Sequence, residues 1–300
     1  MIIKNKAITN GDLTPFKASL MKRFALDKNT IAKCKKDVST KGFLLPVIYE
    51  YSLNVIGFHQ LWERGDSKTF KSLLETAFLA IASMYELKGG KKDDNITIEW
   101  EKGSSVTITN TGEALDDRAQ HWYQAMIIAL ILRDKHKQRR LLNIPINQLL
   151  DQPAVEEHPL YYNNMVKFFH EVYFEGTPKE REEGLKIWFW FQQQDTTLTT
   201  NPFLYICEYQ VATLLSLCLD DEEGFNRHLI EALKQHDEFW TSNLNWEGAP
   251  EEDLLNSLDP QGYVALPLTA MAAMAYDKGW KLTVESDYMP ASMVDGSISK

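Results

Sequence analysis

The sequence of 300 residues has few cysteines and none of the short motifs that mark common catalytic sites. Its cysteines, Cys34, Cys207 and Cys218, are far apart and lack CxxC spacing, which argues against a disulfide framework or a zinc ribbon. The chain has no GxSxG elbow for a nucleophilic serine and no glycine-rich phosphate loop. It therefore predicts no cofactor, no catalytic residues and a reducing compartment.

Long apolar runs are also missing. The longest near-apolar stretch runs over the 13 residues from Val264 to Tyr276 and contains Pro267, so it is too short to span a bilayer. The first residues, MIIKNK, lack the apolar region of a secretory signal. We expect a soluble cytoplasmic protein that does not bind membranes.

A few side chains could carry chemistry, but each has a simpler explanation. His228 and Glu231 stand at i, i+3 and Asp117 and His121 at i, i+4, yet no HExxH or third ligand accompanies either pair. Surface histidines on acidic helices give such pairs by chance, so no metal is predicted. Cys34 lies among lysines, which favours a lowered thiol pKa, but the sequence places no base beside it. An unrecognised helical enzyme is the least favoured hypothesis.

Charge is distributed unevenly along the chain. The net charge is −10, but residues 1–41 carry ten Lys/Arg against three Asp/Glu. Residues 220–260 carry twelve acidic and two basic residues. An acidic body repels nucleic acid and attracts basic proteins. The stretch 220–260 is therefore either a solvated acidic face or a docking surface for a basic partner.

Most of the chain has helical periodicity. Apolar residues between 70 and 85 recur at i, i+3, i+4 and i+7, with Asp66 or Ser67 as the cap. Thr177 and Glu180 form a capping box, and helix starts are expected near 159, 178, 202 and 222. The two helical pairs repeat at about 43 residues, within the range of helical solenoids. We predict a mainly α fold, an antiparallel, solenoid-like helical-hairpin array.

One segment has the periodicity of strands. Ile96 and Ile98 alternate with polar residues before Gly103, and Val106 and Ile108 alternate after it. This predicts a small β-hairpin near residues 95–109. No linker rich in Pro, Gly or Ser divides the chain, so we expect a single helical domain over 1–300. A possible subdivision separates N-terminal helices at 1–88 from an array with a C-terminal cap at 113–300.

Large aromatic residues accompany the acidic stretch. Trp240 and Trp246 are set among carboxylates, as an apolar anchor within a charged rim would be. The block from Trp188 to Phe191 surrounds a helix and is explained by burial in the array or by an interface. The predicted partner-binding residues are Asp220, Asp221, Glu222, Glu223, Trp240, Trp246, Glu251, Glu252 and Asp253.

The C-terminal stretch GYVALPLTAMAAMAYDKGWKLTVESDYMP resembles the signature of the immunity protein 49 family. In this pattern a small-residue helix leads into Ala-x-Asp-x-Gly and then into Ser-x-Tyr-x-Pro. The helix around residues 121–125 is similar to a second family feature. The specific match covers roughly the last 40 residues. The matching positions are Ala275, Asp277, Gly279, Ser286, Tyr288 and Pro290.

The residues of this stretch suit a structural role. Alanines between 270 and 275 let another helix approach closely, and Gly279 can adopt the left-handed conformation that ends a helix. Tyr288 and Pro290 would hold the tail. The stretch is therefore expected to close the helical array as a cap.

The resemblance implies an immunity protein that neutralises a toxin of a bacterial polymorphic toxin system, a weapon of interbacterial competition, without catalysis. With the acidic charge, it implies a basic toxin domain. The lack of a secretory signal predicts that this toxin acts on a cytosolic target. A homodimer is compatible with the sequence. The alternative is a helical-repeat scaffold, or adaptor, that binds another cellular protein.

Overall fold

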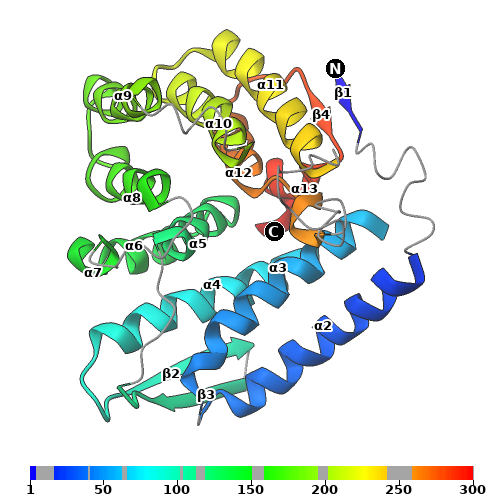
Figure 1. The fold of residues 1–300 in the computed structure, drawn as a ribbon, viewed down its shortest axis with the longest axis vertical. Coiled ribbons are helices and arrows are strands. Elements are labelled where there is room, and N and C mark those ends of the chain that lie inside the picture. The colour runs from blue at the N-terminus through cyan, green and yellow to red at the C-terminus, as the bar shows by residue number, and fades with distance from the viewer. Residues whose placement is uncertain are drawn as a thin grey trace.

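The computed structural model describes residues 1–4, 17–39, 41–62, 66–101, 104–112, 119–150, 159–194, 202–241 and 259–299. Helices form most of the chain, which confirms the mainly α prediction (Figure 1). The helices are α2 (Lys17–Asp37), α3 (Leu45–Trp62), α4 (Ser67–Gly89), α5 (Ala119–Ile131), α6 (Lys135–Leu142), α7 (Ile146–Leu150), α8 (Pro159–Lys167), α9 (Pro178–Gln194), α10 (Pro202–Cys218), α11 (Glu222–Thr241), α12 (Leu266–Asp277) and α13 (Ala291–Val294). Short helical turns are η2 (Gly42–Leu44), the π-helical η3 (Phe168–Tyr173), η7 (Pro260–Tyr263) and η8 (Ser297–Ser299), and the strands are β1 (Ile2–Ile3), β2 (Asn95–Glu101), β3 (Ser104–Thr109) and β4 (Glu285–Ser286).

Local capping signals set the helix starts. Asp66 accepts a hydrogen bond from the backbone N–H of Lys68 at 2.9 Å and so begins α4. Glu180 accepts from the backbone N–H of Thr177 at 2.7 Å, and the Thr177 hydroxyl accepts from the N–H of Glu180 at 3.3 Å. This reciprocal pair is a capping box. The predicted starts at 159, 178, 202 and 222 are confirmed.

The predicted β-hairpin is also confirmed. β2 and β3 pair antiparallel, with Ile96 opposite Ile108 and Ile98 opposite Val106. Ile98 and Ile108 are buried where the hairpin contacts α4. On the exposed face, the hydroxyls of Thr97 and Thr107 lie 3.1 Å apart. The alternation in the sequence therefore corresponds to an inner and an outer face.

Helices that follow one another in sequence lie side by side. α2, α3 and α4 form one layer, α5 contacts α4 and α8, and α10 pairs closely with α11 (Figure 1). One continuous core runs through these helices, from Val38 beside α2 to Leu233 on α11. The array thus has the helical-hairpin character that the sequence predicts.

α12 departs from the neighbour-only contacts of a regular solenoid. It contacts α5, α10, α11 and α13, and it lies in the centre of the fold (Figure 1). Ala270, Ala272, Ala273 and Ala275 are buried, with at most 1% of each exposed. Their small side chains allow close approach of the flanking helices. The small-residue helix therefore forms part of the core.

The N-terminal strand β1 pairs with β4, which precedes α13, and the sequence does not predict this pair. β1 pairs parallel with β4, so that Ile2 lies opposite Glu285 and Ile3 opposite Ser286. The N–H of Glu285 donates to the Met1 carbonyl at 2.8 Å. Strands this short show no periodicity, so their pairing depends on the surrounding packing.

Candidate functional site

The predicted partner-binding residues do not form one described cluster. Asp220 to Glu223 lie at the turn between α10 and α11 and in the first turn of α11. Trp240 lies at the other end of α11, which places it about 27 Å from Glu222 along the helix axis. Trp246, Glu251, Glu252 and Asp253 lie outside the described residues.

Three of the four acids at the start of α11 have structural partners. Asp220, whose φ is 58°, pairs with Lys278. Asp221 accepts from the N–H of Gly224 at 2.9 Å, and Glu222 accepts from the N–H of Lys281 at 2.8 Å. Acids at a helix N-terminus also interact favourably with the helix dipole. The turn is therefore a junction between α11 and the segment after α12.

Other acids between residues 220 and 260 also have partners within the fold. Asp237 is buried and accepts from the Tyr288 hydroxyl at 2.7 Å. Asp259 accepts from the N–H of Gln261 at 3.0 Å, and burial raises the pKa of its carboxyl group. Glu231 pairs with Lys234. Among the acids described between 220 and 260, this leaves Glu223 and Glu238 exposed and without such a partner.

Trp240 is a packing residue. Its ring covers Gly262, where an added Cβ would lie 2.5 Å from Trp240 Cδ2. The ring also lies against His236 and Phe239, with centroid separations of 6.1 and 5.0 Å. Trp240 is half-buried. Trp240 therefore joins α11 to η7, and its role as a partner anchor stays a prediction.

Tyr288 holds the tail against α11, as the sequence predicts. Its side chain is fully buried, its hydroxyl donates to Asp237, and its ring meets His236 edge-on at 4.8 Å. Gly279 has φ 81°, the left-handed conformation expected after α12. Pro290 precedes the short helix α13. These positions of the C-terminal pattern have structural roles.

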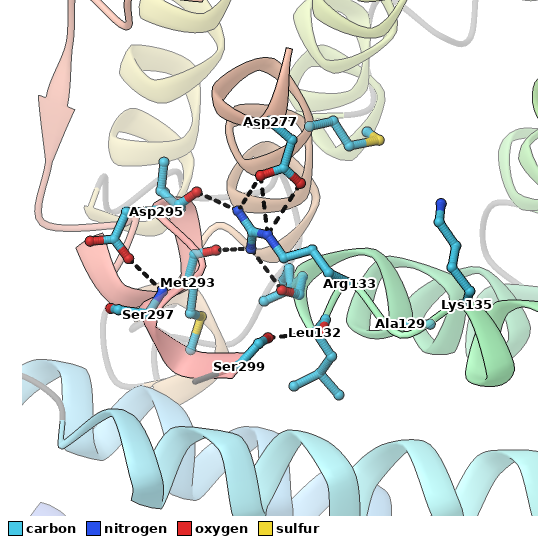
Figure 2. Close-up of polar contacts among 12 residues, drawn as sticks. Ala129, Leu132, Arg133, Lys135, Asp277, Met293, Asp295, Ser297 and Ser299 are labelled. Atoms are coloured by element: carbon cyan, nitrogen blue, oxygen red, sulfur yellow. Dashed lines mark hydrogen bonds and ion pairs between the residues drawn. The ribbon is translucent and has the colours of Figure 1, made fainter. Parts of the chain in front are cut away.

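Arg133 is a structural residue that the sequence analysis missed (Figure 2). Its guanidinium donates to the carbonyls of Met293 at 2.6 Å and Val294 at 2.5 Å, and it pairs with Asp277 at 3.2 Å. Ser299 Oγ donates to the neighbouring Leu132 carbonyl at 2.9 Å. Asp277, the ion-pair partner of Arg133, belongs to the C-terminal pattern. That position is the one feature of the sequence that could have pointed to a cationic partner. Nothing in the short turn after α5 distinguishes Arg133 from a surface arginine.

The sequence model for immunity protein 49 matches residues 63–293 of this chain. The chain belongs to the immunity protein 49 family. It is therefore an immunity protein, and a cognate toxin is the partner that this class implies. A search of curated proteins and a search of solved structures found no match.

The match extends well beyond the C-terminal stretch that carries the resemblance. It includes the hairpin, all of α4 to α12 and most of α13, whereas α2 and α3 lie before it. In this immunity protein 49 family member, the basic helix α2 packs against α3 outside the matched region. No helix within the described ranges combines the length and apolarity needed to cross a membrane.

The described side chains considered for chemistry in this family member have ordinary packing contacts, and Asp117 lies outside the described residues. Burial raises the pKa of the Cys34 thiol, which corrects the expectation that nearby lysines lower it. His228 Nδ1 lies 3.0 Å from Ser216 Oγ. His121 is buried and meets the ring of Tyr49 edge-on. Over the part of the chain that the structure describes, no three His, Cys, Asp or Glu residues gather as a metal site would require.

Proposed function

We propose that this protein binds a cognate toxin in the cytoplasm and neutralises it by protein–protein contact, without catalysis. Membership of the immunity protein 49 family is the observation that supports the proposal. The toxin belongs to a polymorphic toxin system of interbacterial competition. Because the chain has a net charge of −10, the proposed toxin domain is basic. The proposed cytoplasmic location implies that the toxin acts on a cytosolic target such as nucleic acid.

Cysteine chemistry supports the proposed location. Cys34, Cys207 and Cys218 are all free and buried. Burial strongly raises the pKa of the Cys207 thiol, so it is held in the protonated form. Buried, unpaired thiols are typical of proteins that work in a reducing compartment.

Immunity is tested with the neighbouring toxin gene. Cells that carry the toxin should survive only when this protein is also expressed, and its deletion should sensitise the host. A host that stays fully resistant after the deletion refutes the immunity proposal and favours the scaffold alternative.

The location of toxin action is tested by expressing the toxin with and without a secretion signal. Toxicity confined to the exported form would contradict cytoplasmic action.

The proposed contact surface combines the exposed acids at the start of α11 with residues 246–253. A hollow beside α11 is lined by Glu222, Glu223, Arg227 and Lys281 among others, so two basic groups offset its two carboxylates. Charge here would mainly steer encounter, and most of the affinity would come from the aromatic anchor Trp246. Glu251, Glu252 and Asp253 supply the uncompensated charge in this proposal.

Binding kinetics test the surface. Reversing Glu251, Glu252 and Asp253 to Lys should slow association with the toxin and weaken its salt dependence. The matched control reverses three exposed acids elsewhere, Glu99, Glu171 and Glu175, and so changes the net charge equally. If both triple variants associate equally fast, the acidic stretch is not the docking surface.

The aromatic anchor needs a separate measurement. Trp246→Ala should speed dissociation and cost about 2 kcal/mol of binding if it is a hot spot. Its melting temperature should stay unchanged, since an interface anchor does not hold the core together. A lower melting temperature with unchanged dissociation would identify Trp246 as a packing residue, and the block at 188–191 would then be tested next.

A further inference from the structure

The basic helix α2 lies along one outer edge of the fold (Figure 1). It holds seven Lys/Arg and two Asp, so its net charge is +5 and the rest of the chain carries −15. α3 is its main contact, and the face of α2 toward the fold buries Leu20, Asp27, Ile31 and Cys34. The opposite face is exposed to solvent and lies outside the region that the family model matches.

The exposed face of α2 carries a continuous row of side chains, here called the outer stripe. Lys22, Leu26, Asn29, Lys33 and Lys36 recur at i, i+4, i+7, i+11 and i+14, and all five are exposed. The stripe extends about 21 Å along the helix axis. No carboxylate in the part of the chain that the structure describes pairs with its three lysines. Their charge is therefore available to an anionic partner.

Leu26 distinguishes the outer stripe from an ordinary solvated lysine surface. It is 61% exposed, and Met21, five residues earlier, is 46% exposed. Large apolar side chains in water favour a partner that offers an apolar layer beside its charged groups. A lipid bilayer has this layered chemistry, with charged headgroups above the acyl chains. Basic helices with exposed leucines bind such surfaces through both components.

A bilayer fits the outer stripe better than other anionic partners do. A convex helix can lie on a flat surface without the groove that a protein partner would need. A nucleic acid would pair with the lysines but would leave Leu26 in water. The acidic remainder of the chain is repelled from an anionic membrane, which turns α2 toward it. Because α2 is about 10 Å thick and the Debye length is about 8 Å at physiological ionic strength, this repulsion is largely screened.

We propose that the outer stripe of α2 binds the surface of an anionic lipid bilayer. The ammonium groups of Lys22, Lys33 and Lys36 contact the lipid phosphates, and Leu26 inserts among the nearest acyl chains. The expectation that the protein does not bind membranes rests on the lack of a spanning stretch and of a secretory signal, and peripheral binding requires neither. This inference concerns α2 and does not depend on toxin binding.

Vesicles of two compositions test the proposal on the purified full chain. The protein should cosediment with vesicles of equal parts phosphatidylglycerol and phosphatidylcholine, and it should stay in solution with phosphatidylcholine alone. Raising the salt from about 0.1 M to about 1 M shortens the Debye length from about 10 to 3 Å and should release most of the bound protein. Absence of cosedimentation with the anionic vesicles at about 0.1 M salt, or equal binding to both kinds of vesicle, would overturn the proposal.

A triple variant tests the charged component. Each lysine near an anionic leaflet raises the affinity about fivefold, so replacement of Lys22, Lys33 and Lys36 together by Gln should weaken vesicle binding about a hundredfold. The matched control changes the net charge equally and should weaken binding by no more than about twofold. It replaces three exposed lysines outside α2 by Gln, namely Lys68, Lys91 and Lys167. Equal losses in the two variants would overturn the assignment to α2.

A single variant tests insertion. Leu26→Gln removes the apolar side chain and keeps the charge, so it should weaken vesicle binding about tenfold. The matched control Leu219→Gln changes a leucine that is 42% exposed after α10 and should leave binding unchanged. Both variants should keep the melting temperature of the unmodified protein, since both side chains are exposed. Unchanged vesicle binding in Leu26→Gln would refute insertion, and binding of duplex DNA as tight as that of the anionic vesicles would overturn the proposal in favour of nucleic acid.

Discussion

Substitution of Arg133 should detach the C-terminal segment from the turn after α5. The Arg133 side chain is only 19% exposed, whereas its partner Asp277 is 48% exposed. Each charge-assisted hydrogen bond to the carbonyls of Met293 and Val294 contributes about 1.5 kcal/mol. The half-exposed pair with Asp277 adds about 0.5 kcal/mol, because solvent screens it. We expect Arg133→Ala to lower the free energy of unfolding by about 3–4 kcal/mol.

Two further variants separate the contributions. Asp277→Asn removes only the ion pair and should cost less than about 1 kcal/mol. Arg133 has φ 54°, a conformation that costs a residue with a Cβ about 1 kcal/mol. Arg133→Gly should therefore be about 1 kcal/mol less destabilising than Arg133→Ala, although both lack the guanidinium.

Urea denaturation of the four proteins provides the measurement, and hydrogen exchange locates the effect. Amides in residues 291–299 should exchange faster in Arg133→Ala than in Asp277→Asn. The reasoning fails if Arg133→Ala costs less than about 1 kcal/mol. It also fails if Asp277→Asn costs as much as Arg133→Ala, because the carbonyl contacts would then contribute nothing.

Three more substitutions test the packing around α11. Tyr288→Phe removes the hydroxyl that donates to Asp237 and should cost about 2 kcal/mol in urea denaturation, with an unchanged circular dichroism spectrum. Gly262→Ala forces a methyl group onto the Trp240 ring and should lower stability by about 1–3 kcal/mol; a neutral result would show that the ring moves freely. His236 has a folded-state pKa of about 4 against an ordinary value near 6.5, so its stabilising contribution is complete above pH 6.5 and is lost as the pH falls toward 4. His236→Gln should therefore flatten the stability curve over that range, by about 3 kcal/mol in total, and equal slopes would contradict a neutral buried ring.

The sequence predicts elements whose signals are local. Asp66 caps α4 through a contact two residues away, and Thr177 and Glu180 cap each other within one helical turn. The hairpin follows from alternation alone, because each side chain selects its face by position. Such features need no knowledge of distant residues, and the structure agrees with them.

The candidate site was less predictable because its electrostatics depend on distant residues. Asp220 and Glu222 look like free surface charge in the sequence, but Lys278 and Lys281 reach them from a segment more than fifty residues later. Trp240 and the acids at residues 220–223 belong to one acidic stretch of the sequence. In the structure they lie at opposite ends of α11. Counting charged residues over a stretch of sequence averages the charge along the chain. The charge that a surface presents to a partner depends instead on which of those groups remain unpaired in the fold.

The central position of α12 has a consequence for how the protein is synthesised. α5 leaves the ribosome long before α12, although the two helices contact each other in the finished fold. At 5–20 residues per second, the apolar surface of α5 that α12 will cover waits roughly ten seconds for its partner. During that interval the growing chain exposes side chains that aggregate readily. We infer that the nascent chain depends on chaperones until its last helices emerge, and that truncation before α12 yields insoluble protein.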